Sequence, residues 1–97
     1  MSKIYRARIH WISENMGGRR TLPSGDSYAP IIILKGEIID GNCDNWSINV
    51  KIKKIISSNE TIADMIYLSK DAPKVLSTGK EFELYEGMRK VAYGIVL

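Results

Sequence analysis

The chain has 97 residues, of which 44% are hydrophobic and 26% are charged, and its formal net charge is +3 at pH 7. These proportions are ordinary for a globular protein, so we expect a single domain over residues 1–97 with one core and little room for a shielded catalytic cavity. The mild positive charge permits an anionic partner without requiring one.

The cysteine content and the apolar runs indicate where the protein works. Cys43 has no partner for an internal disulfide, whereas a small secreted domain usually contains several cysteines. The first residues are charged but are not followed by the apolar run of a signal peptide. The longest apolar stretch, residues 29–34, is far too short to span a bilayer. We therefore expect a cytoplasmic protein with no membrane contact.

The first segment alternates with a period of two residues, as a half-buried strand does. Its apolar side is expected to carry Tyr5, Ala7, Ile9 and Trp11. Its opposite side is expected to carry Arg6, Arg8 and His10. Two shorter and more apolar pieces, residues 31–34 and 37–39, look like buried strands.

The second half of the chain repeats this pattern. Residues 46–53 alternate between an apolar side and a polar side that includes Lys51 and Lys53. Residues 60–68 could form a short helix, but they are rich in β-prone types, so we expect a strand. Near the end, larger apolar residues alternate with smaller or polar neighbours, at Val91, Tyr93, Ile95 and Leu97. Several short strands with turn residues between them predict an all-β sandwich or barrel.

No group of reactive residues points to catalysis. Residues 77–80 supply the Gly-Lys of a phosphate-binding loop without its first glycine or its hydroxyl residue, so we expect a turn. An Asp-Gly-Asn run begins like a calcium loop but has Asn45 and Lys51 where that loop needs Gly and Glu. His10 and Cys43 are too few for a transition-metal site or a catalytic triad. We therefore expect no enzyme activity, and no nucleotide, metal or other cofactor.

The basic side chains are the most usable polar feature. Arg6 and Arg8 project from one expected strand, and Lys51 and Lys53 project from another. If these strands are neighbours, their shared face would be a cationic surface suited to an anionic ligand such as phosphate. The alternative is the wet, charged outer face that antiparallel sheets commonly have. This alternative is favoured because no exposed aromatic residue clearly interleaves with the basic ones for base stacking.

Three motifs follow one another along the chain: Gly-Gly-Arg-x-Thr at 17–21, Tyr-x-Pro at 28–30, and Phe-x-x-x-Glu-Gly-x-Arg-x-Val-x-x-Gly-x-Val at 82–96. In this order they resemble the C-terminal β-barrel, domain III, of translation elongation factor Tu. The resemblance spans nearly the whole chain, with a poor match at 35–60. It implies a small closed antiparallel β-barrel of about six strands. Gly94, inside a strand, also indicates close backbone approach or a bend in the barrel.

The resemblance implies a partner-binding surface as well. In that family the barrel contacts the T-stem of aminoacyl-tRNA and packs against the GTPase domain. The first loop and the Glu-Gly turn lie near the RNA, and the corresponding candidates here are Arg19, Arg20, Glu86 and Gly87. We therefore expect a stand-alone, non-catalytic binding module for a protein partner or a tRNA-like RNA. The alternative is an immunity or antitoxin-type protein that neutralises a bacterial toxin by direct binding.

Overall fold

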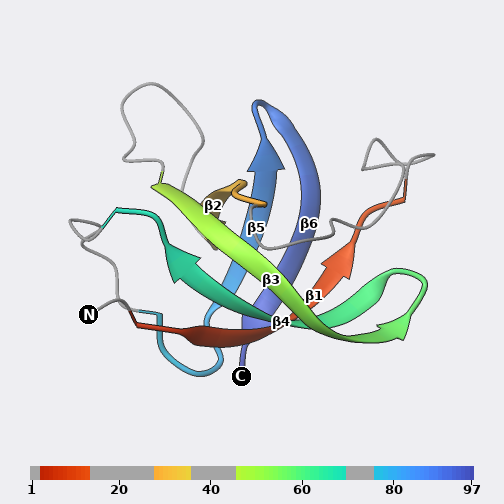
Figure 1. Ribbon diagram of the computed structural model, residues 1–97. Helices are drawn as coiled ribbons and strands as arrows, with labels where there is room; N and C mark the ends of the chain where they lie inside the picture. The colour runs from red at the N-terminus through yellow and green to blue at the C-terminus, as the bar shows by residue number, and fades with distance from the viewer. Residues whose placement is uncertain (1–2, 14–27, 36–45, 70–75) are drawn as a thin grey trace.

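Strands make up most of the described part of the protein, which in this computed structural model comprises residues 3–13, 28–35, 46–69 and 76–97 (Figure 1). None of these residues is helical, so the described part contains no helix that could cross a membrane. The expected strand at residues 60–68 is confirmed. The six strands are β1 (Tyr5–Trp11), β2 (Ile31–Leu34), β3 (Trp46–Ser57), β4 (Glu60–Tyr67), β5 (Glu81–Glu86) and β6 (Arg89–Val96).

The strands form a closed antiparallel barrel in the order β1-β4-β3-β2-β5-β6, with β6 pairing back to β1. This confirms the expected closed barrel of about six strands. β1 is hydrogen-bonded to β4 on one side and to β6 on the other. Side chains from these three strands, which are far apart in sequence, therefore share one outer surface.

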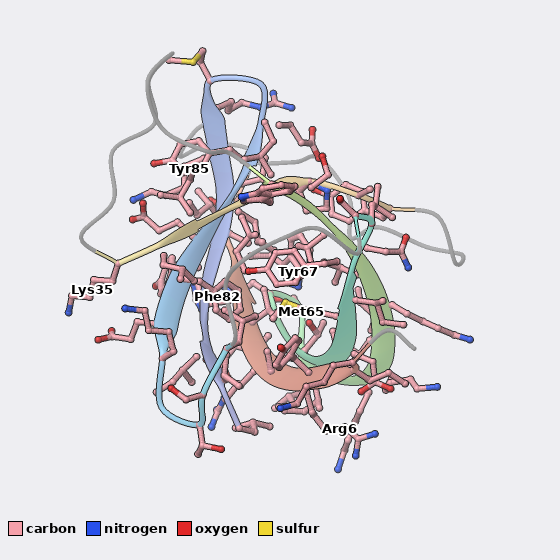
Figure 2. The ribbon with its side chains drawn as sticks, turned by 90° about the vertical axis from the view of Figure 1, so that its left-hand side faces the viewer. Arg6, Lys35, Met65, Tyr67, Phe82 and Tyr85 are labelled. Carbon is pink, nitrogen blue, oxygen red and sulfur yellow. The ribbon has the colours of Figure 1, made fainter. Side chains whose placement is uncertain are left out.

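The barrel interior is filled by one side of each alternating strand. In β1 the buried residues are the expected ones, Tyr5, Ala7, Ile9 and Trp11. Figure 2 shows Met65 and Phe82 inside the barrel and Arg6 outside it. Thr61 is the buried polar residue of the described core, and its Oγ1 accepts a hydrogen bond of 2.9 Å from Trp11 Nε1. Because that polar pair is satisfied, it adds no desolvation penalty to a core of aliphatic and aromatic side chains.

β6 has its small residues inside the barrel and its larger ones outside. Tyr93 and Ile95 are 47% and 39% exposed, whereas Ala92 and Val96 are buried. A Cβ atom at Gly94 would lie only 2.5 Å from the main-chain oxygen of Arg8 and 2.7 Å from Cζ of Phe82. The expected close approach at Gly94 is therefore confirmed.

Two turns have the backbone geometry that their glycines allow. Glu86 pairs with Arg89 across the β5–β6 hairpin, and Gly87 has φ +64°, which fits the first central position of a type II′ turn. At residues 77–80, Lys80 N donates to Ser77 O at 3.0 Å and Gly79 has φ +89°, as in a type II turn. The turn expected at residues 77–80 is confirmed.

Candidate binding surfaces

The end of β3 continues past its pairing with β2 and, among the described residues, stays in register with β4 alone. Residues 53–57 are all exposed, whereas earlier in the strand buried residues alternate with half-buried or exposed ones. Since successive side chains of a strand point to opposite faces, this run has both faces in solvent. The β3–β4 register shifts between Ile52 and Lys54 and again between Ile55 and Ser57, and such bulges bend and twist a strand. In Figure 1 the green hairpin reaches away from the barrel at the lower right. We call residues 53–57 the β3 tip.

The β3 tip combines positive charge with exposed apolar surface. Lys53 and Lys54 are both exposed, and neither has a carboxylate partner in the described part of the chain. Beside them, Ile55 is 63% exposed and Ile56 is 45% exposed. A basic and apolar strand end with solvent on both faces is accessible to a macromolecular partner.

The basic residues of β1 are already paired. Arg6 Nε donates to Asp64 Oδ1 at 3.0 Å. Arg8 donates to Glu60 Oε2 through Nε at 3.1 Å and through Nη2 at 2.6 Å. The hydrogen bond from Arg8 lowers the pKa of Glu60, because it favours the charged form of this carboxyl. β4 therefore places negative charge directly against the basic face of β1.

The two predicted basic groups do not form one surface. β4 lies between β1 and β3, so the strands that carry Arg6 and Lys51 are not neighbours. Asp64 is in register with Arg6 on one side and with Lys51 on the other. A carboxylate thus separates the two groups, and the condition for a continuous cationic face is not met. Lys53 is not opposite this carboxylate, because it lies at the register shift between Ile52 and Lys54, in the β3 tip.

Glu86, at the β5–β6 turn, is hydrogen-bonded within the protein. Glu86 accepts hydrogen bonds from the hydroxyl of Tyr28 at 2.6 Å and from Arg89 Nη2 at 3.1 Å. The contact with Tyr28 joins the end of the hairpin to the segment before β2, and the contact with Arg89 lies within the hairpin. Gly87 is exposed and Met88 is 78% exposed, so these residues form the outermost part of the turn. The other two candidates for the predicted partner surface, Arg19 and Arg20, lie outside the described residues, and their role stays a prediction.

An exposed aromatic side chain lies next to the basic face of β1, contrary to the expectation from the sequence. The rings of His10 and Tyr93 stack with centroids 4.9 Å apart and planes at 27°. His10 Nδ1 also lies 3.7 Å from Glu60 Oε1. Alternation in β6 was visible, but the sequence did not show which side faces outward. Tyr93 faces outward because the ring of Phe82 fills the space beside Gly94 inside the barrel.

Two shallow hollows flank Tyr93 on this outer surface. One, of about 260 Å³, lies towards β1 and is lined by Arg8, His10, Glu60, Glu81, Tyr93, Gly94 and Ile95. The other, of about 210 Å³, lies towards β5 and is lined by Lys35, Glu81, Phe82, Glu83, Tyr93 and Gly94. The described residues contain no group of three or more His, Cys, Asp or Glu side chains that could hold a metal ion.

No protein-family model matches the chain, and no curated protein matches it.

Proposed function

We propose that the protein is a non-catalytic binding module that docks on an acidic surface of another protein through the β3 tip. The observation that carries the proposal is a contrast in charge pairing. Arg6, Arg8 and Lys35 each contact a carboxylate within 3.0 Å, whereas Lys53 and Lys54 have no such partner among the described residues. Positive charges that are not neutralised within the fold are available to attract an anionic partner.

The apolar part of the tip favours a protein partner over RNA. Ile55 and Ile56 add exposed aliphatic surface beside the lysines, and protein interfaces combine an apolar centre with a polar rim. Fully burying one such side chain is worth about 1.5–3 kcal/mol before the costs of association. RNA-binding surfaces instead use aromatic residues on which bases stack, and the tip has none.

Two lysines are also few for binding a nucleic acid by charge alone. Each phosphate that a protein neutralises contributes about 0.7–0.9 to the slope of log affinity against log salt. Proteins that hold duplex DNA electrostatically make about 6–10 such contacts. On a protein, two lysines beside two isoleucines are enough to form part of a standard interface, because a few central residues carry most of the binding energy.

The test compares two charge-matched double variants. Lys53→Glu/Lys54→Glu reverses the tip, and Lys3→Glu/Lys80→Glu makes the same change in net charge elsewhere on the chain. Immobilised wild type and both variants are used to capture partners from lysate, and each captured protein is then purified and its affinity measured by calorimetry. We expect binding to an acidic protein to be lost in the tip variant and kept in the control.

Three results bear on the proposal. Equal affinity of the wild type and the tip variant for every captured protein contradicts it. Binding of purified tRNA that falls steeply with salt and is lost in the tip variant replaces the protein partner by RNA. If the captured protein is a toxin whose activity falls on binding, the role is that of an immunity or antitoxin-type protein.

A further inference from the structure

A second outer surface, centred on β6 and separated from the β3 tip by β1 and β4, has an apolar centre. On β6 and just beyond its end, Tyr93, Ile95 and Leu97 are 47%, 39% and 51% exposed and lie on the same side of the strand. Exposed large apolar residues at successive outward positions form a continuous column. Contiguous apolar surface of this kind marks interaction sites more often than scattered exposed residues do.

The apolar column has opposite charges on its two sides. Towards β1, Ile95 is in register with Arg8 and Tyr93 with His10, while Leu97 N donates to Arg6 O at 2.9 Å. Towards β5, the register partners of Ile95 and Tyr93 are Glu81 and Glu83. The side chains next to the column are therefore basic on the β1 side and acidic on the β5 side. Both sides are also ion-paired within the fold, Arg8 with Glu60 at 2.6 Å and Glu83 with Lys90 at 2.9 Å, so the two flanks differ in the sign of the charge nearest the column and not in net charge.

On each side, the next charged residues further from the column have the opposite sign. Beyond the basic flank lie the carboxylates of β4, Glu60 and Asp64. Beyond the acidic flank lies Lys35, whose Nζ is 3.0 Å from Glu81 Oε2. Across the surface the charges thus read negative, positive, apolar, negative, positive. If the same surface is crossed in the opposite direction, every positive charge takes the place of a negative one, and the apolar column stays in the middle.

We propose that this surface binds a second copy of the same chain, about a two-fold axis parallel to β6. A half-turn about such an axis turns the surface over and exchanges its flanks. Arg8 of one copy then faces Glu81 of the other, and the two apolar columns meet. A two-fold axis across β6 would instead place like charges opposite each other, which costs several kcal/mol. The antisymmetric charge pattern therefore selects one self-complementary arrangement.

The shape of the surface is compatible with this contact. The hollows of about 260 Å³ and 210 Å³ on the two sides of Tyr93 offer room for side chains of the second copy. The outer face of a barrel is convex, so the contact is restricted to the strands on either side of β6. A standard stable interface buries about 800 Å² on each partner. A smaller contact predicts a dimer that dissociates in the micromolar range rather than a permanent one.

Sedimentation velocity from micromolar to millimolar concentration tests the proposal. Wild type should dimerise within this range. Arg8→Glu places a carboxylate opposite Glu81 of the second copy, and Glu81→Arg places a guanidinium opposite its Arg8, so each variant alone should dimerise at least tenfold more weakly. The two variants mixed in equal amounts should recover a dimer, because a carboxylate then faces an arginine at both of these contacts. Lys53→Glu, in the β3 tip, is the matched control and should dimerise like wild type.

Several outcomes overturn the proposal. The first is a wild type that stays monomeric at millimolar concentration. The second is that Arg8→Glu and Glu81→Arg each dimerise as well as wild type. The third is that an equal mixture of these two variants, both folded, stays monomeric. If either charge variant fails to fold by circular dichroism, Ile95→Ser takes its place and should weaken the dimer, and an unchanged dimer in that variant also contradicts the contact. The inference goes beyond the proposed partner binding, and failure of either leaves the other in place.

Discussion

The close packing at Gly94 predicts a large loss of stability for one added methyl group. In Gly94→Ala the new Cβ would lie 2.5 Å from the main-chain oxygen of Arg8 and 2.7 Å from Cζ of Phe82. Ordinary contacts between such atoms are at about 3.5–4.0 Å. The phenyl ring can give way by a small rotation, but the carbonyl belongs to the paired backbone of β1 and β6. The methyl group therefore has to push two hydrogen-bonded strands apart.

The size of the effect follows from these two contacts. Overpacking a filled core typically costs about 1–3 kcal/mol, and each weakened backbone hydrogen bond adds about 1 kcal/mol. Replacing Gly by Ala returns about 0.4–1 kcal/mol by restricting the unfolded chain. We expect a net destabilisation of about 3 kcal/mol. In a domain of this length that lowers the melting temperature by about 12–24 °C.

Thermal and urea denaturation of Gly94→Ala, followed by circular dichroism, measure this loss. Gly79→Ala is the matched control, because Gly79 has φ +89° and no atom within 4 Å of the added Cβ. It should cost only the strain of a left-handed residue, about 1–2 kcal/mol. Adding Phe82→Leu to Gly94→Ala should cost less than the sum of the single changes, since the smaller side chain relieves one contact. A Gly94→Ala protein as stable as wild type would mean that β1 and β6 accommodate the methyl group without separating.

Two titratable groups give further predictions. Tyr67 has a buried hydroxyl without a hydrogen-bond partner among the described residues, and burial raises its pKa from 10.0 to about 12. The folded protein favours the neutral hydroxyl, so the stability that depends on its protonation is full below pH 10.0 and is lost as the pH rises towards 12. Tyr67→Phe removes an unpaired buried hydroxyl, so its melting temperature at neutral pH should match or exceed that of wild type. In urea titrations the variant should also lose less stability than wild type between pH 10.0 and 12. The pKa of Glu60 is lowered from 4.5 chiefly by Arg8, so its contribution is present above 4.5 and is lost as the pH falls through the folded value. Glu60→Gln should therefore be less stable than wild type at neutral pH and equally stable in acid, and a difference that does not change with pH would rule out the Arg8 pair as its cause.

Alternation along the chain was enough to predict the class of fold. The inward side of β1 and the strand at residues 60–68 followed from the order of polar and apolar residues, because a strand exposes alternate side chains. In β6 the same pattern left two sides that could face the core. The larger side chains Tyr93 and Ile95 lie outside because the interior is already occupied by Phe82, and this is a long-range packing fact that local periodicity does not contain.

The binding surfaces depend on which strands pair, and pairing is not local. Arg6 and Arg8 were visible as a basic face, but their neutralisation comes from β4, more than fifty residues further along the chain. Ile55 and Ile56 look like core residues of a strand in the sequence. They are exposed because β3 continues past its pairing with β2, and where that pairing ends depends on the register of the whole sheet.

An NMR titration measures directly whether Lys53 and Lys54 are available to an acidic surface. ¹⁵N-labelled protein is titrated with a short polyglutamate peptide at low salt, with the Lys53→Glu/Lys54→Glu variant measured in parallel. We expect the amide shifts to concentrate in residues 53–57 and to disappear in the variant. Shifts centred on Arg6 and Arg8, and kept in the variant, would contradict it.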